Sequence, residues 1–335
     1  MARIGINGFG RIGRYLVRLM AERNELPVVI NARADNASLA HLFKYDSVHR
    51  TFKGTVGHDE NGIIINGTHI AVTRCKPNEW QWKDYGVDLV VESTGTIKKR
   101  AGLAEHIACG AKKVIMSAPV SDADITIVMG VNDGLYDPAK HDVVSSASCT
   151  TNCLAPVAKA LNDTFGIEQA LMSTIHAATA KQKAVDARAG RDWRTGRSVL
   201  GNIIPSTTGA AKAVGVVIPE LKGKMTGMSF RVPTNDVSVV DLTARLKQPA
   251  SYHDVCVAME NAAQNSMKGI ITCTNDQVVS SDLTGFSETC IFDETAGIML
   301  DNNFVKLIAW YDNEWGYTNK ILDLMAYMHT ADQSR

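Results

Sequence analysis

The sequence lacks a long hydrophobic run, an excess of either charge and a leader-like beginning. No apolar stretch approaches the ~20 residues of a membrane-spanning helix, so we expect none. The 35 basic and 35 acidic residues cancel, which removes the electrostatic reason to expect binding to nucleic acid or to an anionic membrane. Residues 1–5 enter a strand pattern at once and leave no room for a signal peptide. We therefore expect a cytoplasmic protein.

The cysteines form no framework. There are 7 of them, an odd number without regular spacing, which favours a reducing compartment over a disulfide scaffold. Cys149 and Cys153 are accompanied by neither a second pair nor histidines at zinc-ligand spacing, so we expect no metal site. The 335 residues are enough for two domains.

The N-terminal residues carry a dinucleotide-binding pattern. Strand, glycine turn, helix and strand follow one another at residues 2–7, 8–13, 14–23 and 26–31. In this order of elements, the G-x-G-x-x-G pattern indicates a dinucleotide-binding turn. Gly8 permits the tight turn, Gly10 lets the backbone approach a pyrophosphate, and Gly13 packs the helix close to its strand. The pyrophosphate would lie on the helix N-terminus.

Further strand patterns alternate with helical or loop stretches. They lie at residues 88–92, 113–117 and 126–129. This alternation predicts an α/β fold, a Rossmann-type doubly wound parallel sheet. Thr94, Gly95 and Ser117 follow strand ends, where ligands bind in such sheets. Residues 55–73 instead show short strands with Asn-Gly turns, which predicts a local antiparallel insertion.

The end of the second strand bears on the choice of cofactor. An NAD-selecting fold places a carboxylate there for the ribose 2′-hydroxyl, but this chain has Ala32 followed by Arg33. Losing the carboxylate removes repulsion against a 2′-phosphate, and a guanidinium can pair with that phosphate. Arg33 can equally be a solvated loop residue, with Asp35 contacting the ribose. We favour NADP, with NAD as the alternative.

A reactive cysteine is suggested at Cys149. Residues 142–146 have a buried-strand pattern and residues 154–161 have helical spacing, so Cys149 lies near a helix N-terminus. Unpaired backbone N–H groups and the helix dipole favour a thiolate there. These residues alone favour a buried structural thiol over a catalytic one, and locally nothing marks His176 as its partner.

Six blocks together resemble the phosphorylating glyceraldehyde-3-phosphate dehydrogenase family. They are GINGFGRIG at 5–13, SASCTTNCLAP at 146–156, TIHA at 174–177, IIPSTTGAAKAVG at 203–215, FRVPT at 230–234 and WYDNEWGY at 310–317. The resemblance implies a Rossmann domain of residues 1–148 and 315–335. It also implies an α+β catalytic domain of residues 149–314 with a mostly antiparallel sheet. Paired strand patterns at 225–232 and 237–246 agree with such a sheet. A homotetramer is implied as well.

The resemblance implies a mechanism and its residues. Cys149 would be the nucleophile and His176 its acid–base partner, oxidising D-glyceraldehyde 3-phosphate to 1,3-bisphosphoglycerate in glycolysis, gluconeogenesis or carbon fixation. Substrate and inorganic phosphate would be bound by Ser148, Thr150, Thr179, Arg197, Thr208, Gly209 and Arg231. The cofactor would be bound by Gly8, Gly10, Arg11, Ile12, Gly13, Ala32, Arg33, Thr94, Gly95, Ser117, Ala187, Arg188, Asn313 and Tyr317.

Two segments depart from the family pattern. Lys181 stands where members commonly carry Asp or Thr, which adds charge near the substrate phosphate. Arg194 or Arg197 would supply a charge that some members place at Thr195. Ala187-Arg188 replaces the Leu-Pro of many NAD-preferring members, in a loop that approaches a neighbouring subunit's ribose in the family's tetramer. Smaller volume and added charge there also favour NADP, although Arg188 can be a solvated loop residue.

Two other functions fit the same residues. Erythrose-4-phosphate dehydrogenase uses the same site but passes the acyl group to water, so that its rate does not depend on phosphate. A cofactor-bound regulatory or interaction protein would need neither the thiol nor the histidine. The neutral surface and complete set of catalytic residues favour the enzyme.

Overall fold

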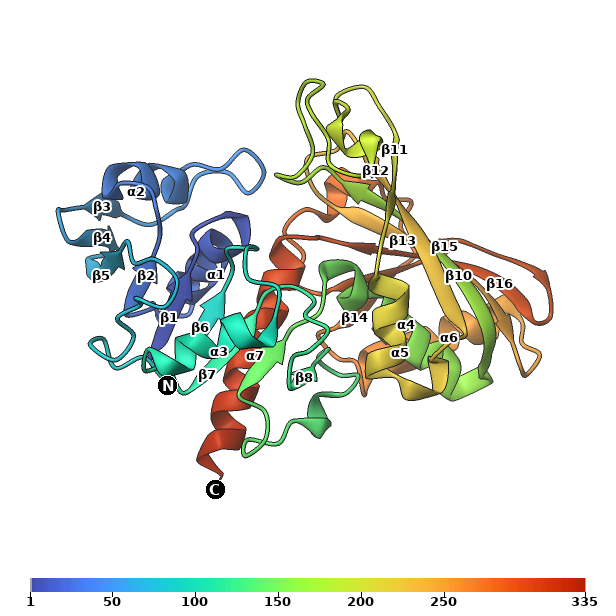
Figure 1. The fold of residues 1–335 in the computed structure, drawn as a ribbon. Coiled ribbons are helices and arrows are strands. Elements are labelled where there is room, and N and C mark those ends of the chain that lie inside the picture. The colour runs from blue at the N-terminus through green and yellow to red at the C-terminus, as the bar shows by residue number, and fades with distance from the viewer. Residues whose placement is uncertain (1, 335) are drawn as a thin grey trace. The chain divides into compact units, whose positions relative to one another are not determined.

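The computed structural model describes residues 2–334, which form two compact units (Figure 1). The first unit comprises the chain up to Ile127, residues Asp133–Ala147, and the chain from Thr318 onward. The second comprises Val128–Asn132 and Ser148–Tyr317. Within the described part of the chain, no helix combines the length and the apolar character needed to cross a membrane.

The first unit is built on a nine-stranded, mostly parallel sheet, as predicted. Its order is β3 (Val56–His58), β4 (Gly62–Ile65), β5 (Thr68–Thr73), β2 (Val29–Asn31), β1 (Ile4–Asn7), β6 (Leu89–Glu92), β7 (Lys113–Met116), β9 (Val143–Ser145) and β8 (Ile125–Thr126). Only the β3–β4 and β4–β5 pairs are antiparallel, so the predicted insertion is confirmed. The predicted strand at 126–129 is wrong in extent, because the chain leaves the sheet after Thr126 and Ile127 N–H donates to the Ser145 carbonyl.

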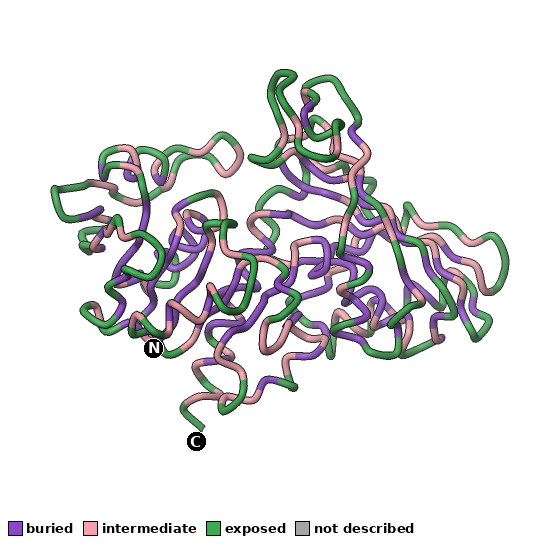
Figure 2. Tube along the Cα trace, viewed as in Figure 1, coloured by how far each residue is buried: buried purple, intermediate pink, exposed green. Residues whose placement is uncertain are grey.

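Four helices accompany this sheet. They are α1 (Arg11–Glu22), α2 (Asn36–Lys44), α3 (Arg100–Ala108) and most of α7 (Trp315–Gln333). The central strands β1, β2 and β6 are buried at every position, and Figure 2 shows them as continuous purple segments. Burial of both faces explains why consecutive positions in these strands are mostly apolar, as in parallel sheets covered on each side. Each strand ends in a buried polar residue, Asn7, Asn31 or Glu92.

The second unit contains a seven-stranded, mostly antiparallel sheet, also as predicted. Its order is β11 (Ile204–Thr207), β12 (Met225–Val232), β10 (Ile167–Ala177), β13 (Ser238–Leu246), β16 (Phe304–Tyr311), β15 (Cys290–Asp301) and β14 (Ile271–Thr274). The patterns at 225–232 and 237–246 form β12 and β13, but the expectation that they pair is wrong. β10 lies between them because the link after β12 passes around its end, where Ala178 N–H donates to the Thr234 carbonyl.

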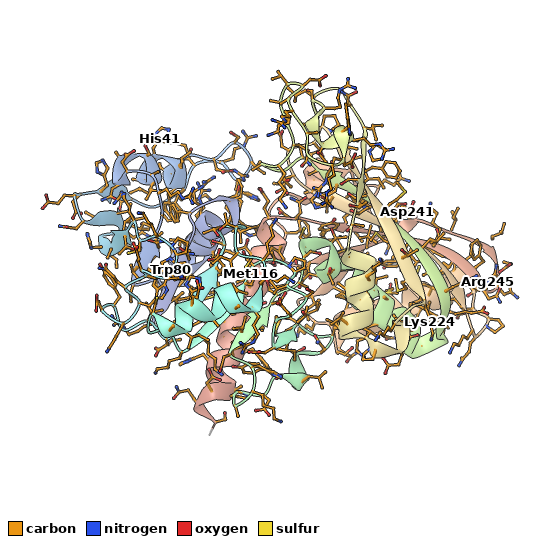
Figure 3. All side chains as sticks on the ribbon, in the orientation of Figure 1. His41, Trp80, Met116, Lys224, Asp241 and Arg245 are labelled. Atoms are coloured by element: carbon orange, nitrogen blue, oxygen red, sulfur yellow. The ribbon has the colours of Figure 1, made fainter. Side chains whose placement is uncertain are left out.

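One face of this sheet packs against helices and the other is partly exposed. The helices are α4 (Cys149–Phe165), α5 (Ala210–Val217) and α6 (Tyr252–Gln264). Along β13 every second residue is buried and those between are partly exposed. Asp241 and Arg245, labelled in Figure 3, belong to the partly exposed set, and Asp241 pairs with Lys306 at 2.6 Å. This alternation is what an antiparallel sheet covered on one side requires.

Candidate active site and dinucleotide pocket

Cys149 is the first residue of α4, which confirms its predicted place at a helix N-terminus. Ser148 caps the helix: its hydroxyl oxygen accepts from Thr151 N–H at 3.0 Å. Ser is a preferred residue at this position. The N–H groups of the first helical turn point toward the N-terminus of α4, where Cys149 lies. The local sequence therefore holds the sulfur at the positive end of the helix dipole.

Backbone strain is present at two residues that adjoin site residues in the chain, Ala147 and Val237. Ala147 and Val237 take φ values of 58° and 59°, in the left-handed region that L-residues rarely occupy. Because Val237 is β-branched, this conformation is sterically less favourable for it than for Ala147. Strain of this kind costs roughly 1–3 kcal/mol and tends to be retained where a site depends on the geometry. Ala147 precedes the cap of α4, and Val237 precedes Ser238.

The structure brings together three of the predicted residues. Cys149 Sγ lies 3.5 Å from Nε2 of His176, within the range of a hydrogen bond to sulfur. Parallel pairing of β10 and β12 places His176 opposite Arg231. Nη1 of Arg231 lies 2.7 Å from Nδ1 of His176 and 3.1 Å from the Ala177 carbonyl oxygen. A thiol, an imidazole and a guanidinium thus follow one another in a row.

Burial controls the protonation of this row. Burial is the largest influence on Cys149 and raises the pKa of its thiol to about 11, whereas the Arg231 charge and hydrogen bonds from Thr150 lower it. Burial, followed by the charge of Arg231, lowers the pKa of His176 to about 3. With these shifts the thiol and the imidazole are both neutral at pH 7. The reactive thiolate then requires a proton transfer to Nε2, where imidazolium and thiolate would stabilise each other.

Tyr311 supports the histidine from behind. Its ring meets the His176 ring edge-on, with centroids 5.9 Å apart and an interplanar angle of 80°. Its hydroxyl lies 2.8 Å from the Thr150 hydroxyl and 2.9 Å from that of Thr174. The Thr150 side chain, predicted as a phosphate ligand, is therefore engaged in the interior. Tyr311 and Thr174 were missed from the sequence, although both lie inside blocks that carry the resemblance.

Asn313 is held by a second polar group that was missed. Ser238 donates its hydroxyl to Asn313 Oδ1 at 2.5 Å and accepts from Ala177 N–H at 3.0 Å. Ser238 and Asn313 are both buried. The bond to Ala177 ties Asn313 to the end of the strand that carries His176. Only the pairing of β10, β13 and β16 joins these residues, so local sequence gives no signal for Ser238.

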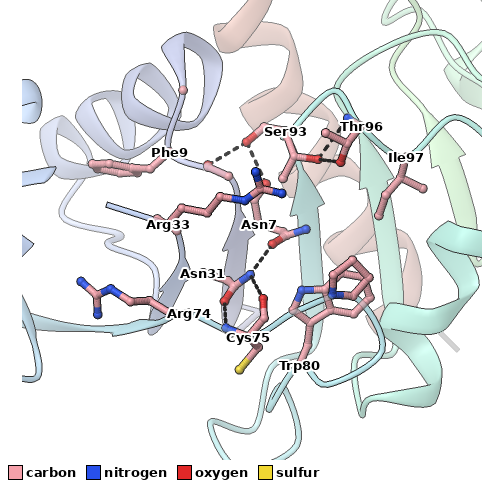
Figure 4. A pocket seen from close by; sticks show the side chains of 15 residues that line it. Asn7, Phe9, Asn31, Arg33, Arg74, Cys75, Trp80, Ser93, Thr96 and Ile97 are labelled. Atoms are coloured by element: carbon pink, nitrogen blue, oxygen red, sulfur yellow. Dashed lines mark hydrogen bonds between the residues drawn. The ribbon is translucent and has the colours of Figure 1, made fainter. Parts of the chain in front are cut away.

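A pocket of about 290 Å³ opens at the glycine turn of the first unit (Figure 4). It unites five of the predicted cofactor residues: Gly8, Gly10, Ala32, Arg33 and Thr94. Its other lining residues include Phe9, Asn31, Arg74, Trp80 and Ile97. It lies at the carboxyl ends of parallel strands, the place where ligands bind in doubly wound sheets.

The turn into α1 fits a dinucleotide pyrophosphate. Gly10 is the N-cap of α1, and no side chain of the described residues caps the helix there. A Cβ at Gly10 would meet nothing within 4 Å, whereas one at Gly13 would meet the Gly8 carbonyl oxygen at 2.2 Å. Gly10 therefore preserves room for the ligand, and Gly13 allows the close packing of the helix on its strand. The uncapped N–H groups can then bind phosphate oxygens.

Arg33 and Arg74 enter this pocket from neighbouring strands. β2 and β5 are parallel, and Ala32 N–H donates to the Thr73 carbonyl, so Arg74 emerges beside Ala32 and Arg33. Figure 4 shows both arginine side chains at the pocket. Arg74 donates to the Ala34 carbonyl and to Asn36, whereas Arg33 is exposed and has no hydrogen-bond or ion-pair partner among residues 2–334. Arg74 was missed because its place depends on the β2–β5 pairing.

Asp35, the alternative ribose ligand, is engaged elsewhere. It is the N-cap of α2, and its carboxylate accepts from the Ser38 N–H and hydroxyl at 2.8 and 2.7 Å. These hydrogen bonds lower the pKa of the Asp35 carboxyl. Asp35 does not line the pocket.

Several predicted cofactor residues lie outside the pocket lining. Arg11 pairs with Asp46 at 2.5 Å and lies over the Tyr15 ring, and Ser117 donates to the Glu92 carbonyl oxygen. The pocket lining also does not include four other predicted cofactor residues: Ile12, Gly13, Gly95 and Tyr317. Ala187 and Arg188 are exposed on the loop after β10 in the second unit.

The remaining predicted phosphate ligands are spread over loops of the second unit. Both the N–H and the hydroxyl of Thr179 donate to the Gln182 side-chain oxygen at 2.9 Å. Gly209 is the N-cap of α5, and the preceding Thr208 hydroxyl accepts from Ala210 N–H. Arg197 forms an exposed ion pair with Asp186 at 2.9 Å. Lys181 is exposed.

Comparisons with known proteins agree along the whole chain. The family model described as glyceraldehyde 3-phosphate dehydrogenase, NAD binding domain, matches residues 2–100, and the one described as its C-terminal domain matches residues 148–313. The chain is 51% identical to the cytosolic glyceraldehyde-3-phosphate dehydrogenase of Chlamydomonas reinhardtii, over 99% of this chain and 97% of the relative. It is 52% identical to glyceraldehyde-3-phosphate dehydrogenase 1 of Saccharomyces cerevisiae, over 99% and 100%. For glyceraldehyde-3-phosphate dehydrogenase 2 of Danio rerio the figures are 52%, 98% and 98%.

Proposed function

This chain belongs to the glyceraldehyde-3-phosphate dehydrogenase family, and on that premise we propose that it catalyses the reversible, phosphorylating oxidation of D-glyceraldehyde 3-phosphate to 1,3-bisphosphoglycerate with NAD(P). The observation that carries the proposal is the 3.5 Å contact between Cys149 Sγ and His176 Nε2 at the start of α4. A nucleophile within reach of a base is the arrangement that covalent catalysis needs. The first unit would bind the cofactor and the second would carry the chemistry.

The chain's own residues account for the acyl transfer. Cys149 passes its proton to His176 Nε2 and its sulfur bonds to the aldehyde carbon. Nε2 returns that proton to the substrate oxygen and takes it back as hydride leaves the carbon, so that a thioester remains. Bound NAD(P) supplies the hydride acceptor. A phosphate oxygen then attacks the thioester carbon, and the sulfur leaves as thiolate.

Two groups would stabilise the oxyanion that forms on the substrate. The Cys149 N–H lies in the first turn of α4, where backbone donors have no intrahelical acceptor. The protonated Nε2 of His176 would be the second donor. Asn313, fixed by Ser238, would orient the nicotinamide carboxamide.

Arg231 would bind the phosphate of the aldehyde substrate. Its Nε is buried and has no hydrogen-bond partner among the described residues, so the guanidinium retains an unused donor. A guanidinium matches a phosphate with two parallel hydrogen bonds. Thr179 would assist it, and Ser148, Thr150, Thr208 and Gly209 would bind inorganic phosphate.

We propose NADP as the preferred cofactor, with NAD also used. Ala32 removes the carboxylate that would repel a 2′-phosphate, and the exposed Arg33 guanidinium has no partner among residues 2–334 to give up. Arg74 adds a second positive charge at the same strand ends. Asp35 is occupied as a helix cap, which weakens the case for an NAD-type ribose contact. Ala187 and Arg188 would act at the ribose of a neighbouring subunit in a homotetramer.

One crossed assay tests the reaction. The rate would be measured with D-glyceraldehyde 3-phosphate or D-erythrose 4-phosphate, with NAD or NADP, and with or without phosphate. We expect the highest kcat/KM with the triose, NADP and phosphate. Turnover that favours erythrose 4-phosphate and ignores phosphate would identify the alternative enzyme, and no turnover with either would favour a regulatory or interaction protein. The identity to a relative named cytosolic supports a cytoplasmic location.

A further inference from the structure

A fully buried carboxylate, Glu92, ends β6 beside the dinucleotide pocket and takes no part in the proposed reaction. Its Oε1 accepts from the Thr94 N–H at 2.8 Å and from the Thr94 hydroxyl. Its Oε2 accepts from Asn7 Nδ2 at 2.5 Å and lies 3.2 Å from Nε2 of His106. Asn7 Oδ1 accepts in turn from Asn31 at 2.8 Å, which fixes the orientation of the Asn7 amide. Asn7, Asn31 and Thr94 all line the pocket.

The donors around Glu92 require its carboxyl group to be ionised. Trp82 Nε1, which can only donate, lies 2.9 Å from Nδ1 of His106. Nδ1 is therefore an acceptor, and the neutral ring carries its hydrogen on Nε2, which donates to Glu92. The Asn7 amide and the Thr94 N–H are further groups that can only donate here. Burial acts to raise the pKa of this carboxyl, but the hydrogen bonds from His106, Thr94 and Asn7 outweigh burial and lower the pKa.

The ionised carboxylate sets the direction of the hydrogen bonds that lead from it to the pocket. A carboxylate can only accept, so the hydrogen of the Thr94 hydroxyl is committed to Glu92. The Thr94 oxygen is then the acceptor in its 2.7 Å contact with the Thr96 hydroxyl, and it also accepts from the Thr96 N–H at 3.2 Å. Thr96 is exposed and lines the pocket. Because its hydrogen is directed toward Thr94, its hydroxyl oxygen presents only lone pairs to a ligand.

Thr96 belongs to the part of the pocket that suits the nucleotide base. The glycine turn would hold the pyrophosphate, and the ribose would lie at the end of β2, beside Arg33. The lining beyond these two places includes the apolar side chains of Pro77, Trp80 and Ile97, and Figure 4 labels Ile97 beside Thr96 on the pocket wall. Apolar and aromatic side chains with a few polar groups are what a site for a flat ring needs. The amino group of adenine is a hydrogen-bond donor and requires an acceptor from such a site.

We propose that Glu92 is a positioning residue that makes Thr96 a hydrogen-bond acceptor for the amino group of the cofactor's adenine. This rests on the proposed binding of NAD(P) in this pocket. Glu92 is buried and acts only through Thr94, whose hydroxyl carries the direction of the hydrogen bonds from the carboxylate to the pocket. Hypoxanthine has a carbonyl oxygen where adenine has its amino group, so its oxygen would face the Thr96 lone pairs. The pocket therefore selects adenine over hypoxanthine.

Binding of NADP and of its hypoxanthine analogue tests this selection without any catalysis. Isothermal titration calorimetry would give the Kd of each dinucleotide. We expect wild type to bind NADP more tightly by roughly three- to tenfold, the range that one neutral hydrogen bond implies. Thr96→Val removes the acceptor at an exposed position, so its two Kd values should become equal. Thr68→Val, at an exposed threonine of β5, is the control and should keep the wild-type ratio.

Glu92→Gln tests the role of the carboxylate, because an amide has one donating and one accepting end. If its NH₂ group turned toward Asn7 and His106, it would face two groups that can only donate. Turned toward Thr94, it faces only one such group, the N–H, because the Thr94 hydroxyl can reverse. That hydroxyl would then accept from the new amide and donate to Thr96, whose own hydrogen is released toward the pocket. We therefore expect the preference to invert, with the hypoxanthine analogue bound more tightly than NADP.

The inversion separates this role from mere support of the fold. If Glu92 only stabilises the first unit, Glu92→Gln weakens both dinucleotides alike and keeps the wild-type ratio, which would overturn the proposal. If circular dichroism shows that Glu92→Gln does not fold, Thr94→Val decides: it breaks the link to Thr96 and should abolish the preference, whereas Thr94→Ser should retain it. An unchanged ratio in Thr94→Val would refute the proposal. Equal binding of the two dinucleotides by wild type would refute this inference alone, whereas binding of neither would refute the proposed function as well.

Discussion

His176 and Arg231 lie opposite each other in the parallel pair β10–β12, and Nη1 of the arginine touches Nδ1 of the histidine at 2.7 Å. The other ring nitrogen faces Cys149 Sγ. A positive charge therefore lies on one side of the imidazole and the nucleophile on the other. Substitutions at these three positions should have distinct effects.

Loss of either member of the reactive pair should be severe. Cys149→Ser should abolish turnover, because a serine hydroxyl is a far weaker nucleophile here and no thioester can form. His176→Asn removes the acid–base group and should lower kcat by about 10²–10⁴-fold. Turnover by Cys149→Ser close to wild type would refute the covalent mechanism.

Stability should fall on acidification because of His176. Burial and Arg231 lower its folded-state pKa from 6.5 to about 3, so between these values the unfolded chain binds a proton that the native chain does not. The free energy of unfolding should then drop by about 1.4 kcal/mol for each pH unit below 6.5 from this group alone. His176→Asn lacks this contribution. Urea titrations at pH 7 and pH 5 should show a smaller loss of unfolding free energy in the variant than in wild type. An equal loss in the two proteins would contradict the prediction.

Much of this arrangement could be predicted from the sequence because its signals are local. The strand, glycine turn and helix at residues 2–23 adjoin along the chain, and so do Ser148, Cys149 and the helix that follows. Arg74 could not be placed, because only the parallel pairing of β2 with β5 brings it beside Ala32. Tyr311 and Ser238 likewise reach the site through strand pairs far apart in sequence. The error at β12 and β13 has the same cause, since no local pattern shows that β10 inserts between them.

The cofactor preference should respond to Arg33. Arg33→Gln removes one charge-assisted contact and disturbs no hydrogen bond of the described residues, so folding should be unaffected. We expect kcat/KM with NADP to fall about 10- to 100-fold, as loss of a charged hydrogen bond of roughly 1.5–3 kcal/mol implies, with little change for NAD. Adding Ala32→Asp should reverse the preference. Arg100→Gln, an exposed arginine paired with Asp124, is the control. Equal losses with both cofactors would contradict the assignment.

Tyr311 should stabilise the second unit more than it contributes to catalysis. Tyr311→Phe keeps the ring against His176 but leaves the Thr150 and Thr174 hydroxyls without their shared partner. Leaving buried polar groups unsatisfied costs about 1–3 kcal/mol, so the midpoint of urea unfolding should fall by a corresponding amount. Tyr45→Phe, on a tyrosine that is 53% exposed, should change little. An unchanged midpoint in Tyr311→Phe would show that the network carries no net stability.

The acyl-enzyme can be observed directly. D-glyceraldehyde 3-phosphate and NADP would be mixed with the protein in phosphate-free buffer while reduced cofactor is followed in a stopped-flow instrument, and the protein would then be analysed by mass spectrometry. We predict a burst of about one reduced cofactor per site, little turnover afterwards, and a 3-phosphoglyceryl adduct on Cys149 that disappears when phosphate is added. Sustained turnover without phosphate, or a burst with no adduct on Cys149, would contradict the phosphorylating thioester mechanism.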